Sequence, residues 1–222
     1  MLDILYDDDD IVVVDKPAGR PVHPSPGHEE GALSTELVRR FPQMRGVGSA
    51  ERPGVVHRLD VETSGVMVFA KTARAYLKLR RAFEAHTEVK KTYLAVLQGA
   101  PKERRGTLRT LIGKRADKKR MRVVEPGGEG QLAVTHWEVL GKHNGLALVE
   151  FRIETGRTHQ IRVHAAHLGH PVVGDRLYGD ASRPRRAGRL LLHAVELAFA
   201  HPVTGKAMRF VAAPPPDIVY AQ

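Results

Sequence analysis

The strongest constraint on the fold is a run of strand-like segments between Gly106 and Arg152. Apolar side chains recur there at the spacing typical of β-strands, in the segments TLRTLIG, RMRVV, LAVTHWEVL and LALVEFRI, and turns rich in glycine or lysine separate them. No regular alternation of strand and helix accompanies this run. We therefore predict an α+β fold with a mixed, largely antiparallel β-sheet core and flanking helices, and not a doubly wound parallel sheet.

The rest of the chain supplies further strands and about three helices. Strands are predicted at residues 2–5, 11–17, 66–71, 92–99, 190–199 and 207–213, with an acidic turn at 7–10 and loops at 17–31 and 42–53. A first helix is predicted over residues 32–41, because its apolar residues share one face. Thr72 should cap a second helix that ends near residue 86, and Thr158 a third that stops at Gly169.

Composition limits the kind of protein. The 222 residues suit one domain, which we place at 1–222, and 42% hydrophobic with 27% charged residues is typical of a soluble globular chain. Cysteine is absent, which excludes disulfides, thiolate nucleophiles, iron–sulfur clusters and cysteine-based zinc sites. The acidic N-terminus lacks the features of a secretory signal, and no apolar stretch approaches the roughly 20 residues of a membrane-spanning helix. We expect a cytoplasmic protein.

The net charge indicates a polyanionic partner. The chain has 35 basic and 25 acidic residues, an excess of +10 that is typical of nucleic-acid-binding proteins, although a merely soluble basic protein would look similar. Most of the excess falls between Lys102 and Arg122, where ten basic residues oppose Glu103 and Asp117. A second cluster comprises Arg183, Arg185, Arg186 and Arg189. Neither contains an aromatic residue for base stacking, so both are predicted to contact phosphates; a solvated hairpin is the alternative for the first.

Three polar segments are candidates for chemistry: HRLDVETSG at 57–65, KTY at 91–93 and GRTHQIR at 156–162. Asp60 lies in a polar loop before a buried strand, where a carboxylate is either a turn former or an active-site acid, base or nucleophile. Tyr93 lies in an apolar strand and would usually be a core tyrosine, and Arg162 would usually be a surface arginine. Each signal is weak by itself.

The combination of these segments carries a family resemblance. HRLDVETSG resembles the catalytic signature of the RluA-type pseudouridine synthases, which modify RNA. The resemblance continues in DKPAGRPVHPS at 15–25, KTYLAVLQG at 91–99 and TGRTHQIRVHAAHLGHPVVGDRLYG at 155–179, in the family's order. It implies the pseudouridine synthase fold with an active-site cleft. It also implies a single catalytic domain without the small N-terminal RNA-binding domain of many relatives, because strand-like sequence begins at Leu2.

The resemblance implies that uridine in tRNA, large-subunit rRNA or both is converted to pseudouridine. The N1–C1′ bond breaks, the uracil turns, and C5 bonds to C1′. By motif match, Asp60 is the essential catalytic aspartate, Tyr93 the tyrosine beside the uracil, and Arg162 the basic partner of Asp60. A carboxylate can meet the positive charge that builds at C1′, and an arginine keeps the carboxylate ionised and directed. The reaction involves no redox change and no external group transfer, so neither a cofactor nor a metal is required.

RNA is the implied partner, with the target uridine extruded from its stack. The resemblance places Arg58, two residues before Asp60, where its guanidinium can occupy the vacated stack, and His57 either assists or packs the loop. Phosphate contacts are predicted for Lys114, Arg115, Lys118 and Lys119. No membrane and no protein partner is required, and we expect a monomer.

Other function classes use the same residues. A metallohydrolase would use His159, His164, His167 and His170, but a helical histidine pair at four-residue spacing with an adjacent glutamate is missing. A serine hydrolase would need G-x-S-x-G around Ser64, which the sequence lacks. A non-catalytic RNA-binding or chaperone protein would use the same basic surfaces, but it has no use for a buried carboxylate that repels phosphate.

Overall fold

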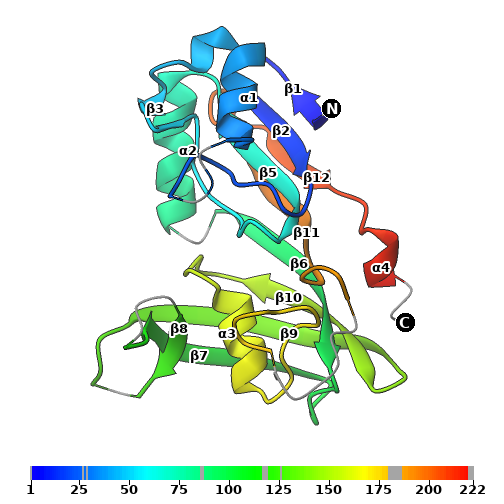
Figure 1. Cartoon of the computed structure of the whole chain (residues 1–222). Helices are drawn as coiled ribbons and strands as arrows, with labels where there is room; N and C mark the ends of the chain where they lie inside the picture. Colours follow the sequence, from blue (N-terminus) through cyan, green and yellow to red (C-terminus); the bar gives the residue numbers. More distant parts are fainter. Residues whose placement is uncertain are drawn as a thin grey trace. The chain divides into compact units, whose positions relative to one another are not determined.

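The computed structural model describes residues 2–26, 28, 30–85, 88–116, 120–125, 127–179 and 187–219. The chain divides into two compact units, unit 1 (Met1–Lys90 with Ala194–Ala213) and unit 2 (Lys91–His193 with Pro214–Gln222), which can be followed in Figure 1. Each unit has its own strands and helices. That the range 1–222 is one catalytic domain stays a prediction.

Unit 1 contains antiparallel strands in the order β1-β2-β5-β11, with β12 paired to β11. These strands are β1 (Asp3–Asp7), β2 (Ile11–Lys16), β5 (Ser64–Ala70), β11 (Leu192–Ala200, most of it in this unit) and β12 (Ala207–Val211). The other elements are helix α1 (Leu33–Arg40), the 3-10 turn η1 (Pro42–Met44), the ribbon of β3 (Gly48–Ser49) and β4 (Arg52–Pro53), and helix α2 (Ala73–Ala85).

Apolar residues explain why β2 and β5 form the centre of unit 1. Residues 11–14 of β2 are fully buried, as is every residue of β5, and such continuous apolar runs are typical of strands covered on both faces. Helix α2 packs on β5 with the buried residues Ala75, Leu79 and Phe83, which lie four residues apart on one face. The first turn of α2 is capped as predicted, because Oγ1 of Thr72 accepts the N–H of Ala75 at 3.2 Å.

Gly65 lies where β5 begins, directly after the HRLDVETS segment. It pairs with Lys16 of β2 and has a φ of +117°, a conformation that other residues rarely adopt. A Cβ at this position would lie 2.2 Å from the carbonyl oxygen of Ala194 in the neighbouring strand. Only glycine therefore allows the chain to leave the polar loop and enter the sheet at this point.

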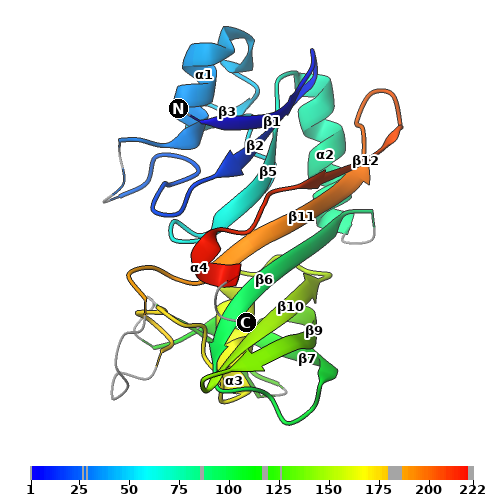
Figure 2. The ribbon, with the colours of Figure 1, turned by 90° about the vertical axis from the view of Figure 1, so that its right-hand side faces the viewer.

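Unit 2 contains a second antiparallel set of strands in the order β6-β10-β9-β7-β8, of which Figure 2 shows β6, β10, β9 and β7 side by side. These strands are β6 (Lys90–Gln98), β7 (Arg105–Lys114), β8 (Met121–Val124), β9 (Gln131–His143) and β10 (Leu146–Ile153). Two helices complete the unit, α3 (Gln160–His167) and α4 (Pro216–Val219). The predicted largely antiparallel α+β fold is confirmed in both units.

Helix α3 covers one face of the unit 2 sheet. Its Val163 packs in a buried cluster with Ile112 of β7 and Ala133 of β9. Directly opposite residues of antiparallel neighbours share a face. A row of such pairs runs across the same face from β6 to β7: Tyr93 with Phe151, Phe151 with Trp137, and Trp137 with Gly106. Tyr93 therefore lies on the α3 face of the sheet.

Gly106 is required by this row. A Cβ at Gly106 would lie 2.2 Å from the ring of Trp137, because the indole lies across the glycine. The glycine thus provides the space that a large aromatic side chain occupies on the α3 face.

The third helix begins later than predicted. It starts at Gln160, and its N-cap is His159, which has a left-handed backbone conformation (φ 55°) and no capping side chain, so the predicted Thr158 cap is wrong. The side chain of Gln160 explains the difference. Its Oε1 accepts the backbone N–H of Arg157 at 3.0 Å and the hydroxyl of Thr155 at 2.8 Å, and these bonds hold the preceding turn in place of a cap.

Other boundaries differ by a few residues. Strand β1 extends to Asp7, and the acidic turn is held by Asp8, whose Oδ1 accepts the N–H groups of Asp10 and Ile11. Gly169, with a φ of +81°, follows the end of α3 as predicted. The predicted loop at 42–53 contains η1 and the β3–β4 ribbon, which are too short to leave a periodic pattern. Among the described residues, no helix is long and apolar enough to cross a membrane.

Candidate active site

The HRLD segment forms a loop between β4 and β5 in unit 1. Within it Leu59 is buried, Asp60 is half-buried and Arg58 is exposed. Lys16, at the end of β2, is fully buried, and its Nζ donates hydrogen bonds to the carbonyl oxygens of Pro17 (3.0 Å), Val61 (2.8 Å) and Thr63 (2.7 Å). The backbone that follows Asp60 is therefore fastened to β2 by a lysine side chain.

Lys16 is an ionisable side chain at a fully buried position, which is unusual for a lysine. Burial lowers the pKa of Lys16 to about 7, and the negative charges of Asp60 and Glu62 oppose this fall. A buried ammonium needs acceptors, and the three carbonyls supply them. Lys16 belongs to the DKPAG segment of the family resemblance, so two of the recognised segments meet within unit 1.

His57 anchors the start of the same loop. Its Nε2 accepts the backbone N–H of Val68 in β5 at 3.1 Å, and its ring stacks on Phe83 of α2 with centroids 4.4 Å apart and an angle of 11°. These are the contacts of a loop-packing residue, one of the two roles expected for it. Its part in the reaction stays a prediction.

Arg162 is buried in α3 of unit 2, unlike an ordinary surface arginine, and is 7% exposed. Its Nε and Nη2 donate to the two carboxylate oxygens of Asp175 at 2.8 and 2.9 Å, which is the paired geometry of a strong charge-assisted contact. The guanidinium also lies 5.2 Å from the ring centroid of Tyr178. These contacts fix the direction of the Arg162 side chain.

Asp175 is a site residue that the sequence reasoning missed. Its side chain is fully buried, and its Oδ1 also accepts the backbone N–H groups of Leu177 (2.9 Å) and Tyr178 (3.0 Å). Burial raises the pKa of Asp175, but the hydrogen bond and charge of Arg162, together with the two N–H groups, outweigh it and lower the pKa. Asp175 is the only acidic residue between 155 and 179, a signal that was available in the sequence.

A buried polar network holds α3 on the sheet. Gln160 Nε2 donates to the carbonyl of Val134 (3.0 Å) and to Oγ1 of Thr135 (2.8 Å). The ring of His164 bonds to Thr135 through Nδ1 (2.8 Å) and to Thr110 through Nε2 (3.0 Å). Because every partner is satisfied, the network fixes one seating of the helix that carries Arg162.

The network predicts a pH dependence of folding. Burial, and secondarily the charge of His167, lowers the pKa of His164 to about 4. An unfolded histidine has a pKa near 6.5, so below that pH the unfolded chain binds more protons and the free energy of unfolding falls. Between pH 8 and pH 5 this loss amounts to about 2 kcal/mol. Urea unfolding at both pH values should show the loss in the wild type and a smaller loss in His164→Gln.

A matched control for this prediction is His143→Gln. His143 is exposed at the end of β9, and its variant should keep the pH dependence of the wild type. Equal pH dependence of the wild type and His164→Gln would show that His164 does not titrate with a lowered pKa.

The structure places the predicted residues differently from one another. Tyr93, 9% exposed, and Arg162 belong to unit 2, whereas Asp60 belongs to unit 1, so their meeting stays a prediction. Lys114 and Arg115 are exposed at the end of β7. Lys118, Lys119, Arg183, Arg185 and Arg186 lie outside the described residues. Arg189 forms a paired contact with Asp217 at 2.6 and 2.7 Å.

Three of the four histidines of the metallohydrolase alternative have other partners, and His167 is exposed. Besides His164, Nδ1 of His159 bonds to the hydroxyl of Tyr178 (2.8 Å), and Nδ1 of His170 to the carbonyl of Gln98 (3.1 Å). Across the part of the chain that the structure describes, no group of three or more His, Cys, Asp or Glu side chains is placed to hold a metal ion.

Similar sequences agree with the motifs. A protein described as an uncharacterized RNA pseudouridine synthase of Synechocystis is 41% identical over 220 residues, covering 96% of this chain and 66% of the relative. Ribosomal large subunit pseudouridine synthase D of Haemophilus influenzae is 39% identical over 230 residues, covering 98% and 69%. The chain thus spans about two thirds of the length of these relatives.

Solved structures and a family model give the same result. The human protein RNA pseudouridylate synthase domain containing 1 superposes with a TM-score of 0.79 at 32% identity, covering 100% of this chain and 86% of that one. The related human domain containing 4 protein gives a TM-score of 0.77 at 28% identity, covering 99% and 91%. The RNA pseudouridylate synthase family model matches residues 10–167, from β2 through α3. The chain therefore belongs to the RNA pseudouridylate synthase family.

Proposed function

We propose that the protein is an RNA pseudouridine synthase that isomerises uridine to pseudouridine with Asp60 as the essential carboxylate. The observation that carries the proposal is the HRLD loop of unit 1. A half-buried carboxylate stands there on a backbone fastened by the buried ammonium of Lys16, inside a chain that belongs to this family. A turn-forming aspartate needs no such anchoring.

The residues divide the chemistry in a defined way. Cleavage of the N1–C1′ bond builds positive charge at C1′, which the carboxylate of Asp60 stabilises, traps covalently or relieves by removing a neighbouring proton. Tyr93 supplies a flat wall for the uracil and a hydroxyl for the proton that leaves C5 after the C5–C1′ bond forms. In this proposal Arg162, directed by Asp175, keeps Asp60 ionised.

The substrate is RNA with an extruded uridine, in tRNA or large-subunit rRNA. One relative is named as a large-subunit enzyme, which supports the second of these RNAs. The protein acts as a monomer without a protein partner, a metal or a cofactor, and Arg58 occupies the space that the uridine leaves. A cytoplasmic location stays a prediction.

The test is a map of pseudouridines in cellular RNA. A strain that lacks the gene should lose pseudouridine at defined positions, and the purified protein should restore them in RNA from that strain. If no RNA gains pseudouridine in either arm, the protein is a non-catalytic RNA-binding protein, the alternative that the basic surfaces also allow.

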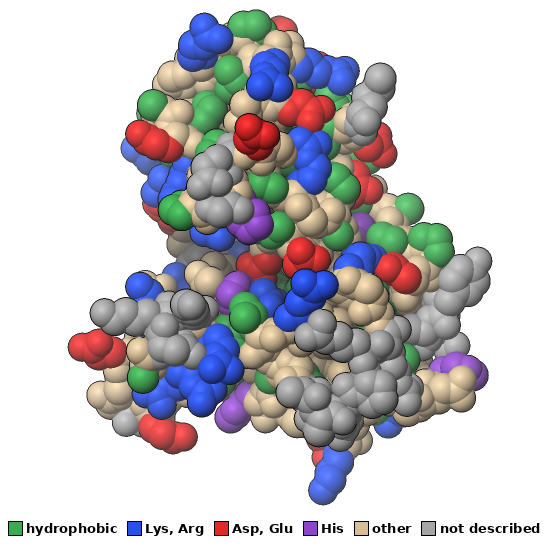
Figure 3. Space-filling view, viewed as in Figure 1, with side chains coloured by type: hydrophobic (Ala, Val, Ile, Leu, Met, Phe, Trp, Pro, Cys, Tyr) green, Lys and Arg blue, Asp and Glu red, His purple; other side chains and the backbone are tan. Residues whose placement is uncertain are grey.

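Successive side chains of a strand point to opposite faces of the sheet, so the basic residues between Lys102 and Arg122 are distributed over both faces. Thr110, Ile112 and Lys114 alternate onto the α3 face, as the bond from Thr110 to His164 shows. Arg105 and Arg109 point to the opposite face. In Figure 3, which views the α3 side, Lys and Arg side chains gather over β7 and β8.

The opposite face is less suited to a polyanion because it carries carboxylates. Glu150 lies 3.2 Å from Arg152, and Glu138 lies 3.9 Å from both Arg152 and Arg104. These pairs offset positive charge on that face. The RNA is therefore expected on the α3 side, which also carries Tyr93.

Replacement of the hairpin cations should reduce the salt dependence of RNA binding. The variant changes Lys114, Arg115, Lys118 and Lys119 to Ala. Each lost phosphate contact should reduce the magnitude of the slope of log binding constant against log salt concentration by about 0.7 for single strands or 0.9 for duplex. Four contacts change it by roughly 3. Titration of one RNA at several salt concentrations measures the slope, and the single-turnover rate at saturating RNA should stay near that of the wild type.

The matched control is the double variant of Arg105 and Arg109 to Ala, on the opposite face of the same strand. Its slope should equal that of the wild type. Superimposable slopes for the wild type and the quadruple variant would mean that the segment is a solvated hairpin, and an equal fall in both variants would mean that the binding surface is not confined to the α3 side.

A further inference from the structure

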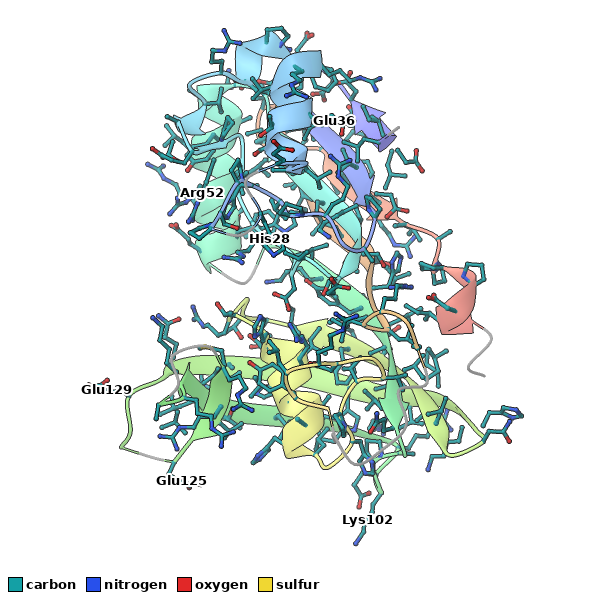
Figure 4. All side chains as sticks on the ribbon, in the orientation of Figure 1. His28, Glu36, Arg52, Lys102, Glu125 and Glu129 are labelled. Atoms are coloured by element: carbon teal, nitrogen blue, oxygen red, sulfur yellow. The ribbon has the colours of Figure 1, made fainter. Side chains whose placement is uncertain are left out.

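Unit 1 contains a cavity of about 480 Å³ beside the HRLD loop. Its lining comes from the β3–β4 ribbon, the HRLD loop and helix α2, and it includes His23, Arg52, His57, Arg58, Tyr76 and Arg80. Figure 4 labels Arg52, which lies close to α2 in that view. All of these residues belong to one unit, so the cavity is defined within unit 1 alone.

Two guanidinium groups in this cavity are free to bind a ligand. Within the described part of the chain, the side chains of Arg52 and Arg58 form no hydrogen bond and no ion pair, and both residues are exposed. Arg80 differs, because it is paired with Glu84 at 2.6 Å and donates to the hydroxyl of Tyr76 at 3.2 Å. Like charges that line one hollow favour the arrival of an anion.

The other polar groups in the lining do not neutralise these charges. His23 is buried, and this burial, together with the charges of Arg52 and Arg58, lowers the pKa of its ring, which favours the neutral form. Glu51 also lines the cavity and its charge interacts with that of Arg52, but it is one exposed carboxylate, hydrogen-bonded to Ser49, among the three lining arginines Arg52, Arg58 and Arg80. The cavity therefore keeps a net positive charge.

One wall of the cavity is flat and fixed. A Cβ at Gly48 would lie 2.7 Å from the ring of Tyr76, so the ribbon backbone covers one part of the ring closely. The hydroxyl of Tyr76 is held by Arg80. A rigid aromatic side chain next to free guanidinium groups is an arrangement that suits a nucleotide.

We infer that this cavity binds the phosphodiester adjacent to the target uridine, with Arg52 as its ligand, beside Arg58, which fills the space that the uridine leaves. The inference rests on the proposed function, which makes RNA the substrate. Arginine binds phosphate oxygens through paired donors, and the cavity that Arg52 lines also borders the HRLD loop, which carries Asp60. Arg52 lies outside the recognised segments and extends the RNA-binding surface from the catalytic loop to the β3–β4 ribbon.

The experiment removes either the charge of one phosphodiester in the RNA or the charge of Arg52 in the protein, and then both together. The RNA is a stem-loop in which the wild-type protein forms pseudouridine, made with an uncharged methylphosphonate at each single linkage near the target. At one linkage the substitution should weaken binding to the wild type about tenfold, and in Arg52→Gln the same substitution should have almost no effect. Arg52→Gln should also lower the salt slope by about 0.7 to 0.9.

The control variant is Arg81→Gln, which removes an exposed arginine of α2 that does not line the cavity. It should respond to every methylphosphonate as the wild type does. If the wild type modifies the RNA but no linkage couples to Arg52, the subsite is wrong and the proposed function stands. If the wild type forms no pseudouridine in any RNA, the proposed function is wrong, and the subsite with it.

Discussion

Asp60→Asn should abolish turnover while leaving the fold and the RNA affinity broadly intact. The change removes the charge that meets C1′ but keeps the shape of a half-buried side chain, and the phosphate contacts lie elsewhere. We expect a loss of single-turnover rate on the order of 10⁴-fold or more, the size seen when an essential catalytic carboxylate is removed. The measurement is pseudouridine formation at saturating enzyme, beside RNA binding and thermal unfolding of the same preparation.

Glu62→Gln is the matched control for this variant. Glu62 is an exposed carboxylate two residues further along the same loop, and its charge also acts on Lys16. Its variant should keep the wild-type rate. Multiple turnover by purified Asp60→Asn would contradict the assignment of Asp60 as the catalytic carboxylate. An equal loss of rate in Glu62→Gln would show that only the total charge of the loop matters.

Asp175→Asn should lower both the stability and the rate. It leaves the buried guanidinium of Arg162 without its counterion, a change that costs about 3 to 5 kcal/mol in the free energy of unfolding. The proposal also predicts a fall in the single-turnover rate, because the guanidinium of Arg162 is no longer held in one orientation. RNA affinity should change little, because no phosphate contact is lost. Asp175→Glu keeps the charge and should recover part of the stability, which keeps the test usable if the first variant folds poorly.

A surface pair of the same geometry provides the comparison. Asp217 receives two bonds from Arg189, as Asp175 does from Arg162, but its side chain is 46% exposed. Asp217→Asn should cost no more than about 1 kcal/mol and leave the rate unchanged. Similar losses of stability in the two variants would contradict the view that burial makes the Arg162–Asp175 pair important.

Local patterns in the sequence predicted much of the fold. A continuous apolar run located β5, period-two runs located strands of unit 2, and the hydroxyl of Thr72 before an apolar helix face located the start of α2. Such signals depend on neighbours within a few residues. The start of α3 depended instead on a glutamine that satisfies the preceding turn, which no propensity rule describes.

The site residues show the same limit more strongly. Lys16 has the sequence context of an ordinary lysine after a strand, yet it is buried because carbonyl groups 45 and 47 residues away accept its hydrogen bonds. Arg162 has the sequence context of a surface residue, yet it is buried because the carboxylate of Asp175, 13 residues later, forms an ion pair with it. Charges that are stabilised across such separations can be identified from sequence only through a family resemblance or through an isolated acidic residue such as Asp175.

The attachment of the HRLD loop to Lys16 restricts how this site can be reused in protein engineering. A loop of residues 57–63 transplanted onto another scaffold would carry Asp60 but not the donor for the carbonyls of Val61 and Thr63. Each of these groups, left buried and unpaired, would cost roughly 1 to 3 kcal/mol, enough for the loop to adopt another conformation. The smallest portable piece therefore includes the end of β2, and a loop moved without it loses the position of its carboxylate.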